Sequence, residues 1–271
     1  MELPVEILID EAYASEQSAF PSRTISAGVI GNQCLAFLEL NLRAFADDPA
    51  QPKTRRIFRD GHRIEEDVLS DLRKAGLNIV DRDLITGKQI TYLAYGGHVK
   101  AKVDGVIEHK DGSVQLLEIK SMNDANWTKF KKSGLCTSHP KYVSQVMLEM
   151  GMSGIGSALV VAYNKNTSEY HSEVIVFDEF EYYALMHKAE VVLHGMAERI
   201  AAEKDDWRCR GCFKKRACWE SHITATSCRN CKHSVPEVTG GWTCSITNTE
   251  AVEVCPSWEL FSVKEKGGAS I

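Results

Sequence analysis

Long apolar runs are absent from this 271-residue sequence. No stretch approaches the roughly 18 consecutive apolar residues that a membrane-spanning helix needs. The first residues, Met1-Glu2-Leu3-Pro4, also lack the basic start and apolar run of a signal peptide. We therefore expect a cytoplasmic protein that makes no membrane contacts and whose cysteines are reduced.

A general excess of positive charge is absent as well, because the formal net charge at pH 7 is -5. This balance argues against a protein whose whole surface is built to bind nucleic acid. Basic residues instead gather in three runs, which can neutralise phosphates or simply form solvated faces. These runs are Arg55, Arg56, Arg59 and Arg63; Lys129, Lys131 and Lys132; and Arg208, Arg210, Lys214, Lys215 and Arg216.

The pattern of apolar residues predicts a mixed α/β core. Helices are expected over 24–46, 61–75, 140–151 and 179–203, and a linker over 47–53. Strands are expected within 77–95 and over 98–109, 114–121, 156–163 and 171–177. Beyond the last helix the periodicity fades, and cysteine, glycine and tryptophan dominate. We expect metal ions to help hold that C-terminal region together.

Asp104, Glu118 and Lys120 carry the clearest chemical signal. Their strands are joined by Lys110-Asp111-Gly112-Ser113, a typical hairpin turn. Glu118 and Lys120 are two residues apart on a strand, so their side chains leave the same face. Two carboxylates on one face form an oxygen site suited to Mg²⁺ or Mn²⁺, and a nearby lysine can stabilise charge on a phosphate. The alternative is an edge hairpin with solvated acids.

The length of the hairpin loop decides whether these groups meet. A two-residue loop would place Asp104 opposite Ile119, with the two carboxylates on opposite sides of the sheet. A three-residue loop would pair Lys110 with Val114 and place Asp104 opposite Lys120. The hypothesis therefore requires an odd-length loop or a bulge, with Gly112 as the residue of positive φ.

His62 and Glu66 lie four residues apart on the preceding expected helix, with Glu65 beside them. A neutral imidazole at position 62 can supply a further metal ligand, and Glu66 can bind a water or a second ion. The alternative for these side chains is an exposed helix surface.

Tyr142 and Gln145 lie three residues apart on the later expected helix, with Glu149 on the same side. The glutamine can orient a water or a phosphate, and the tyrosine can touch a nucleic-acid backbone. The alternative is the ordinary polar stripe of an amphipathic helix.

Together these residues resemble the PD-(D/E)xK nuclease superfamily, and within it the RecB-like exonucleases. The matching motifs run in the family's order from Gly61 to Gln145, with Val103 where the family nominally has a proline. The motifs are Gly61-His62 with Glu65-Glu66, Val103-Asp104-Gly105, Glu118-Ile119-Lys120 and Tyr142-x-x-Gln145. The resemblance implies a restriction-endonuclease-like core, in which helices flank a mixed central sheet.

The resemblance also implies how the residues divide the work. A divalent metal would be bound by His62, Asp104, Glu118 and the carbonyl of Ile119. Lys120 and Gln145 would complete the site, with Glu66 and Tyr142 beside it. The implied reaction is in-line attack of a metal-activated water on a DNA phosphodiester.

Cys209, Cys212 and Cys218 can hold one metal centre but leave its fourth position open. RecB-like nucleases with an iron–sulfur cluster, the AddB subunit and the CRISPR-adaptation nucleases, join three such cysteines to one that precedes the core. By this resemblance Cys34 would complete a 4Fe–4S site. Two alternatives stay open: Cys34 is simply a small buried residue, or Cys228 is the fourth ligand.

Cys228, Cys231, Cys244 and Cys255 are typical of a separate structural Zn²⁺ site. Two four-ligand sites would use eight of the nine cysteines and leave Cys136 over. Spacing does not separate zinc from iron, and a histidine, His222 or His233, can replace a cysteine. The tryptophans in this region can stack on unpaired bases or fill its small core; they are Trp207, Trp219, Trp242 and Trp258.

The sequence therefore predicts a DNA exonuclease that acts on single strands or duplex ends in recombination, repair or phage DNA processing. A recombination protein or a single-strand-binding protein is the expected partner. Two other interpretations are a CRISPR-adaptation nuclease that trims DNA and a catalytically silent nucleic-acid-binding protein. The expected segments are an N-terminal helical part with Cys34 (1–60), the nuclease core (61–203), the iron–sulfur segment (204–222), a zinc module (223–263) and a loose tail (264–271).

Overall fold

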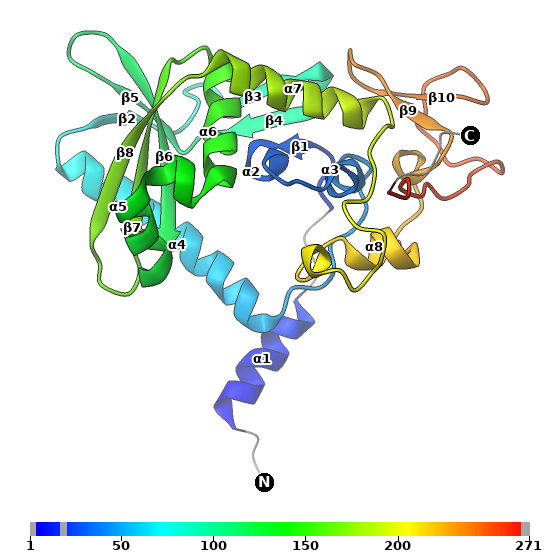
Figure 1. Cartoon of the computed structure of the whole chain (residues 1–271), viewed down its shortest axis with the longest axis horizontal. Helices are drawn as coiled ribbons and strands as arrows, with labels where there is room; N and C mark the ends of the chain where they lie inside the picture. Colours follow the sequence, from blue (N-terminus) through cyan, green and yellow to red (C-terminus); the bar gives the residue numbers. More distant parts are fainter. Residues whose placement is uncertain (1–3, 17–20, 267–271) are drawn as a thin grey trace.

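A five-stranded mixed sheet forms the centre of the computed structural model, which describes residues 4–16 and 21–266. Its strands lie in the order β2 (Asn78–Val80), β5 (Gly105–Glu108), β6 (Val114–Met122), β7 (Ser157–Asn164) and β8 (Tyr170–Val176). β6 and β7 are parallel, and the other neighbouring pairs are antiparallel. Figure 1 shows this sheet on one side of the molecule and the cysteine-rich region on the other.

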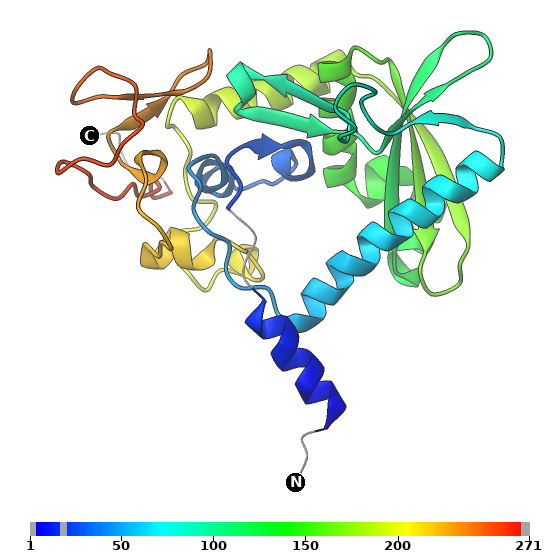
Figure 2. The ribbon, with the colours of Figure 1, turned by 180° about the vertical axis from the view of Figure 1, so that it is seen from behind.

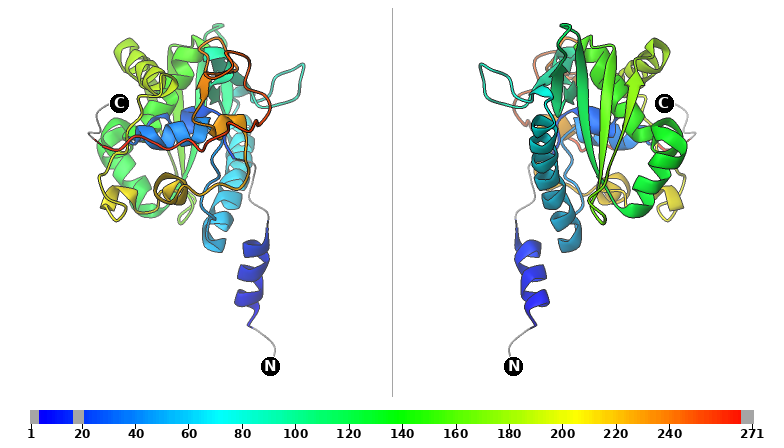
Figure 3. Two further views of the ribbon diagram at one scale, coloured as in Figure 1. Left: turned by 90° about the vertical axis from the view of Figure 1, so that its right-hand side faces the viewer. Right: turned by 90° about the vertical axis from the view of Figure 1, so that its left-hand side faces the viewer.

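Helices cover both faces of this sheet, which explains why residues 116–119 of β6 are buried without alternation. The long helix α4 (Pro52–Lys74) packs Ile64 and Val68 against Leu117 and Ile119 on one face. Helices α5 (Asp124–Ser138) and α6 (Pro140–Ser153) cover the other face (Figure 3). Glu118 and Lys120 point toward that face, where both are hydrogen-bonded to Gln145 of α6. The predicted mixed α/β core is confirmed.

A second, three-stranded sheet adjoins the first, in the order β1 (Ile25–Ser26), β4 (Val99–Lys102) and β3 (Thr91–Ala94). The short helix η1 (Tyr95–Gly97) joins β3 to β4. The prediction of one strand over 98–109 is wrong, because the chain changes sheets at Val103-Asp104. Gly105 permits this crossing, since a Cβ there would lie 2.8 Å from Cγ2 of Ile79. Asp104 consequently sits where the two sheets meet.

The prediction of one helix over 24–46 is also wrong. The segment forms β1 and two short helices, α2 (Ala27–Ile30) and α3 (Leu35–Leu42). At the break, the side chain of Asn32 accepts a hydrogen bond from the Cys34 N–H, a local contact that competes with helix. Gly31 lies so close to α6 that a Cβ would be 3.0 Å from the Cα of Lys141. Packing against α6 therefore fixes a break that the apolar spacing does not reveal.

Other element boundaries differ from the sequence-based expectations. Helix α4 begins at Pro52, inside the expected linker, because proline suits the first turn of a helix. Helix α7 (Glu179–Leu193) ends before Gly195, which has a positive φ of 64°. Two helices were not expected: α5 and the N-terminal α1 (Val5–Ser15). α1 buries no residue and projects from the body beside the start of α4 (Figures 1 and 2).

Short elements make up the C-terminal region. They are η2 (Trp207–Cys209), α8 (Lys215–Glu220), η3 (Cys228–Asn230), β9 (Ser234–Pro236) and β10 (Trp242–Cys244). The region packs on α3 through a small cluster that includes Leu40, Phe45 and Ala217. Of the expected tail, Lys264 bridges to Glu198, and 267–271 lie outside the described residues. Within the described ranges, no helix is long and apolar enough to span a membrane.

Candidate active site

The loop between β5 and β6 has an odd number of residues, as the hypothesis of a shared Asp104–Glu118 site required. Five residues, 109–113, connect the strands, and Glu108 pairs with Val114. Gly112 has the expected positive φ, 85°. The particular register with Lys110 opposite Val114 is wrong by two residues. Since Gly105 pairs with Leu117, the same register continued by one residue places Asp104 opposite Glu118.

Glu118, Lys120 and Gln145 form one hydrogen-bonded network. Lys120 Nζ lies 2.5 Å from Glu118 Oε1 and donates to Gln145 Oε1 at 2.9 Å. The Gln145 amide donates to Glu118 Oε1 at 2.8 Å and to Glu149 Oε1 at 3.0 Å. Burial alone would lower the pKa of Lys120, but Glu118, Asp104 and Glu149 together outweigh it and the pKa is raised. Lys120 is therefore a fixed cation among acids.

Asp104 joins this group from the junction of the two sheets. Its Oδ2 accepts the backbone N–H of Ile119 at 2.8 Å, and Gln89 Nε2 lies 3.5 Å from its Oδ1. Burial, helped by repulsion from Glu118 and Glu65, raises the pKa of Asp104 to about 8. The hydrogen bond to Ile119 locks this carboxylate onto the strand that carries Glu118 and Lys120.

Acidic groups outnumber cations in this cluster. Burial and then repulsion from Glu118 raise the pKa of Glu149 well above its usual value. Burial likewise raises the pKa of Glu65, and repulsion from Glu118 adds to this effect. Glu118 Oε2 is buried and has no hydrogen-bond partner among the described residues. A buried carboxylate oxygen without a partner, among acids that resist ionisation, fits a site that is completed by a cation.

The structure does not present a ready-made metal site, however. In the described ranges, no group of three or more His, Cys, Asp or Glu side chains is arranged to hold an ion. His62 shows why, since its side chain is 84% exposed and its Nδ1 lies 4.0 Å from Glu65 Oε2. The acids are gathered at one place, but His62 points into solvent.

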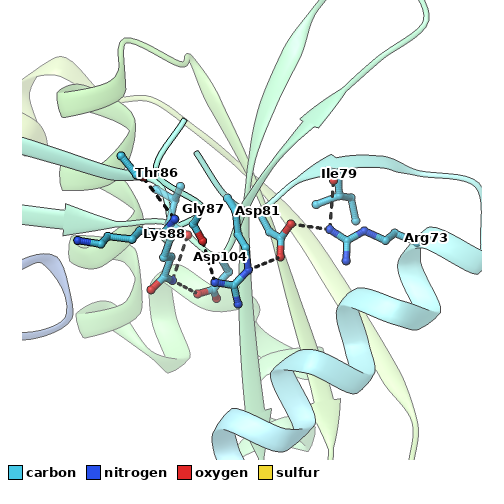
Figure 4. Close-up of polar contacts among 10 residues, drawn as sticks. Arg73, Ile79, Asp81, Thr86, Gly87, Lys88 and Asp104 are labelled. Atoms are coloured by element: carbon cyan, nitrogen blue, oxygen red, sulfur yellow. Dashed lines mark hydrogen bonds and ion pairs between the residues drawn. The ribbon is translucent and has the colours of Figure 1, made fainter. Parts of the chain in front are cut away.

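Two clefts open beside Asp104, and His62, Glu65 and Gln89 line both of them. The first cleft also contains Glu66 and residues of the loop after β2. Asp81 of that loop accepts a hydrogen bond from Arg73 of α4 at 2.7 Å, and Arg82 donates to the Gly87 carbonyl at 3.3 Å. Figure 4 shows this bonded loop next to Asp104. The wall of the first cleft is thus held by side-chain contacts.

The second cleft carries residues that the sequence analysis missed. Lys100 and Lys102 of β4 line it together with Gln145 and the segment that contains β1. The two lysines point to one face because they are two residues apart on a strand, while Val99 and Ala101 are buried. The alternation of lysine and apolar residues is visible in the sequence. The cleft that the lysines line could not be predicted, because that cleft depends on pairing between β1 and β4.

Tyr142 contacts the network through Lys120, whose Nζ lies 4.7 Å from the centre of the phenol ring. The ring also stacks on His139, with centroids 5.3 Å apart and planes 6° apart. Tyr142 is therefore held between two neighbours and contributes a cation–π contact that helps to position Lys120.

The two cysteine sets lie apart from this site. Cys34, Cys209, Cys212 and Cys218 line one pocket, and Cys228, Cys231, Cys244 and Cys255 line another. Burial raises the pKa of Cys212 and raises that of Cys218 to about 11. Cys136 is exposed on α5. The structure thus groups the four cysteines that the resemblance implied and the four that the spacing suggested. They are free thiols without metal-holding geometry in the described part of the chain.

The histidines that were alternative ligands have other contacts. His222 Nδ1 lies 3.2 Å from Arg216 Nη2, and His233 Nε2 lies 3.3 Å from Glu259 Oε1. His233 also lines the pocket of the second cysteine set. It therefore remains an available alternative ligand there.

Residues 35–156 match the family described as the YqaJ-like viral recombinase domain, which is a PD-(D/E)xK nuclease family. The matched segment contains His62, Asp104, Glu118, Lys120 and Gln145. This match confirms the predicted resemblance to the PD-(D/E)xK superfamily. No curated protein matches the chain.

Among solved structures, the chain is similar to the alkaline exonuclease LHK-Exo from Laribacter hongkongensis. In the complex of that protein with dAMP the identity is 16%, the TM-score 0.45, and the match covers 69% of this chain and 90% of the other. A further structure of LHK-Exo gives 16% identity, a TM-score of 0.42, and coverage of 68% and 90%. The protein SSO0001 gives 13% identity, a TM-score of 0.44, and coverage of 83% and 100%.

Proposed function

We propose, taking residues 35–156 as a YqaJ-like nuclease domain, that this protein is a metal-dependent DNA exonuclease of recombination, repair or phage DNA processing. The observation that carries the proposal is the bonded network of Glu118, Lys120 and Gln145, which faces Asp104 inside the matched segment. Acids, a lysine and a glutamine held at these distances have the composition of a phosphodiester-hydrolysing site.

The residues present suit Mg²⁺ or Mn²⁺. Asp104, Glu118, the carbonyl of Ile119 and, after its side chain turns inward, His62 would hold the ion. When bound, such an ion activates water and offsets charge on a phosphate. Two observations support this assignment. Glu118 Oε2 is buried without a hydrogen-bond partner, and burial together with neighbouring acids raises the pKa of Asp104, so a bound cation would relieve both.

The chain's own residues would prepare the substrate. Lys120, held by Glu118 and Gln145, places a positive charge where the attacked phosphate gains negative charge. Gln145 orients both partners and can turn its amide toward a water. Glu66, at the first cleft, can hold a further water or ion, and Tyr142 keeps Lys120 in place.

DNA would approach through the second cleft. Lys100 and Lys102 supply two ammonium groups there, close to Asp104 and Gln145. Contacts of this kind fix the position of a phosphate backbone without reading its sequence. A single strand or a duplex end is the substrate that we propose, with a recombination or single-strand-binding protein as partner.

The two cysteine sets would hold separate metal centres. Cys34, Cys209, Cys212 and Cys218 would bind a 4Fe–4S cluster that ties α3 to the segment before α8. Cys228, Cys231, Cys244 and Cys255 would bind a structural Zn²⁺. The support is that each set shares one pocket. We keep the five proposed segments: the N-terminal helical part with Cys34 (1–60), the nuclease core (61–203), the iron–sulfur segment (204–222), the zinc module (223–263) and the tail (264–271).

Spectroscopy and metal analysis test these centres without any activity assay. We expect visible absorbance that is lost in Cys212→Ala and zinc content that is lost in Cys231→Ala. The exposed Cys136→Ala, the matched control, should retain both. A colourless purified protein with zinc in both sets would overturn the iron assignment.

An end-labelled DNA assay tests the main proposal. Wild-type protein with Mg²⁺ or Mn²⁺ should shorten labelled DNA stepwise from one end, and Glu118→Gln should abolish this. Glu181→Gln, an exposed acid on α7, is the matched control. DNA binding without cleavage in the wild type would favour the silent binding protein. Stepwise trimming that stops at a defined length would favour a CRISPR-adaptation nuclease.

A further inference from the structure

Two exposed phenylalanines from distant parts of the sequence meet at the surface. Phe58 lies on α4 and Phe213 lies between η2 and α8, with ring centroids 6.4 Å apart and planes tilted by 56°. Phe58 is 52% exposed and Phe213 is 38% exposed. The backbone carbonyl of Phe213 accepts a hydrogen bond from the N–H of Asp48 at 2.5 Å, which holds the loop that carries Phe213 in place. These rings therefore form a fixed apolar patch in water.

Helix α4 connects this patch to the candidate active site. Phe58 and His62 are four residues apart on α4, so they share a face and lie about 6 Å apart along the axis. His62 lines both clefts beside Asp104. A strand that leaves these clefts along α4 would therefore pass Phe58, one helical turn from His62.

Exposed arginines lie close to both phenylalanines along the chain. Arg59 is adjacent on α4 with a 61% exposed side chain, although it also contacts Asp60 and Tyr13. Arg210 and Arg216 are exposed on the segment that carries Phe213. Arginines beside exposed aromatic rings match the chemistry of an unpaired strand, whose phosphates are negative and whose base faces are free.

We propose that Phe58 and Phe213 form a stacking platform for unpaired bases of the DNA strand beyond the part held in the clefts. The inference rests on the proposed nuclease function and narrows its substrate to DNA with a single-stranded segment. Bases within a duplex already stack on each other, so the platform acts only where a strand is unpaired. An apolar protein partner would not use the arginines in this way.

Binding measurements on the full chain carrying Glu118→Gln, which prevents cleavage, test the platform. Phe58→Ala and Phe213→Ala should each weaken binding of fluorescent oligo-dT by roughly tenfold, and blunt duplex binding should not change. Phe58→Trp should restore binding, whereas Phe58→Leu, which keeps apolar packing, should not. Phe180→Ala on α7, which removes an 88% exposed ring elsewhere, is the matched control.

An abasic oligonucleotide sharpens the test, because it keeps the phosphates and removes the bases. Both phenylalanine variants should bind the abasic strand as tightly as the parent protein does. Equal losses on oligo-dT, abasic strand and duplex would overturn the platform, and so would unchanged oligo-dT binding. If the wild-type protein neither cleaves nor binds DNA, the proposed nuclease function itself is wrong. If the wild-type protein cleaves duplex ends and the phenylalanine variants bind oligo-dT as tightly as the parent, only the stacking platform is wrong.

Discussion

The nuclease core around the β5–β6 hairpin and the cysteine-rich region are stabilised by different kinds of contact. In the core, long strands and three covering helices bury side chains on both faces of the sheet. In the cysteine-rich region, the elements are three to six residues long and the local cluster contains five buried residues. The first region is held mainly by apolar burial, while the second depends more on individual polar contacts.

Arg43 shows this dependence most directly. Its buried guanidinium pairs with Glu39 at 3.0 Å and stacks 3.8 Å from the centre of the Phe261 ring. It also donates to the carbonyls of Cys231 and Ser234 at 3.3 and 3.1 Å. The side chain of Arg43, the residue that directly follows α3, thereby binds backbone carbonyls at and just after Cys231.

The largest expected effect lies in the core. Lys120→Ala should lower the DNA cleavage rate by about a thousandfold, because it removes the positive charge at the attacked phosphate. The thermal midpoint should fall as well, because the variant leaves the buried Glu118 without the ammonium group that lies 2.5 Å from it. Single-turnover cleavage and a thermal melt measure the two quantities. A cleavage rate within threefold of wild type would remove Lys120 from the active site.

The next effect lies in the cysteine-rich region. Arg43→Ala should lower the free energy of unfolding by about 3–5 kcal/mol, because it leaves Glu39 buried without its partner. Proteolysis should then cut first within 223–263. The double variant Glu39→Gln with Arg43→Met should recover part of the loss. If the core and this region melt together and cleavage is uniform, the two regions are one cooperative unit.

A smaller effect depends on pH. The folded pKa of Asp104, about 8, lies above its ordinary value of 3.8, so the folded protein binds this proton more tightly than the unfolded chain does. Metal-free wild type should therefore lose stability as pH rises from about 4 to about 8. Asp104→Asn should gain stability across that window, on the order of 1–2 kcal/mol at its upper end. Denaturant titrations at pH 5 and pH 8 measure this gain, and an equal gain at both would contradict the assignment.

The smallest effect concerns an exposed ion pair outside both regions. Asp10 of α1 lies 2.6 Å from Arg56 of α4 in solvent. Asp10→Asn should change the free energy of unfolding by less than about 1 kcal/mol, far below the effect of Arg43→Ala. A chemical denaturation series compares the two. A loss as large as that of Arg43→Ala would show that α1 is an integral part of the core.

The acids of the site could be predicted because their geometry is local. Glu118 and Lys120 share a face by strand alternation, and the odd parity of the hairpin followed from the need to bring Asp104 to that face. The exact register could not be predicted. Loops of three and five residues have the same parity, and Gly112 suits both.

Features that depend on distant packing could not be read from the sequence. The break at Gly31 is fixed by Lys141 on α6, and the close approach of Ile79 on β2 leaves no room for a Cβ at Gly105, where the chain enters the second strand. Lys100 and Lys102 gained a role only when β4 paired with β1. Candidate site residues were therefore easier to predict from the sequence than the clefts that surround them.

The crossing of the chain from β4 to β5 places Asp104 between the second cleft and the strand of Glu118. On one side, Lys102 is two residues away and faces the second cleft; on the other, Asp104 is bonded to the strand of Glu118. In the proposed function, a phosphate bound by Lys102 would therefore lie only two residues along the backbone from a carboxylate of the metal site.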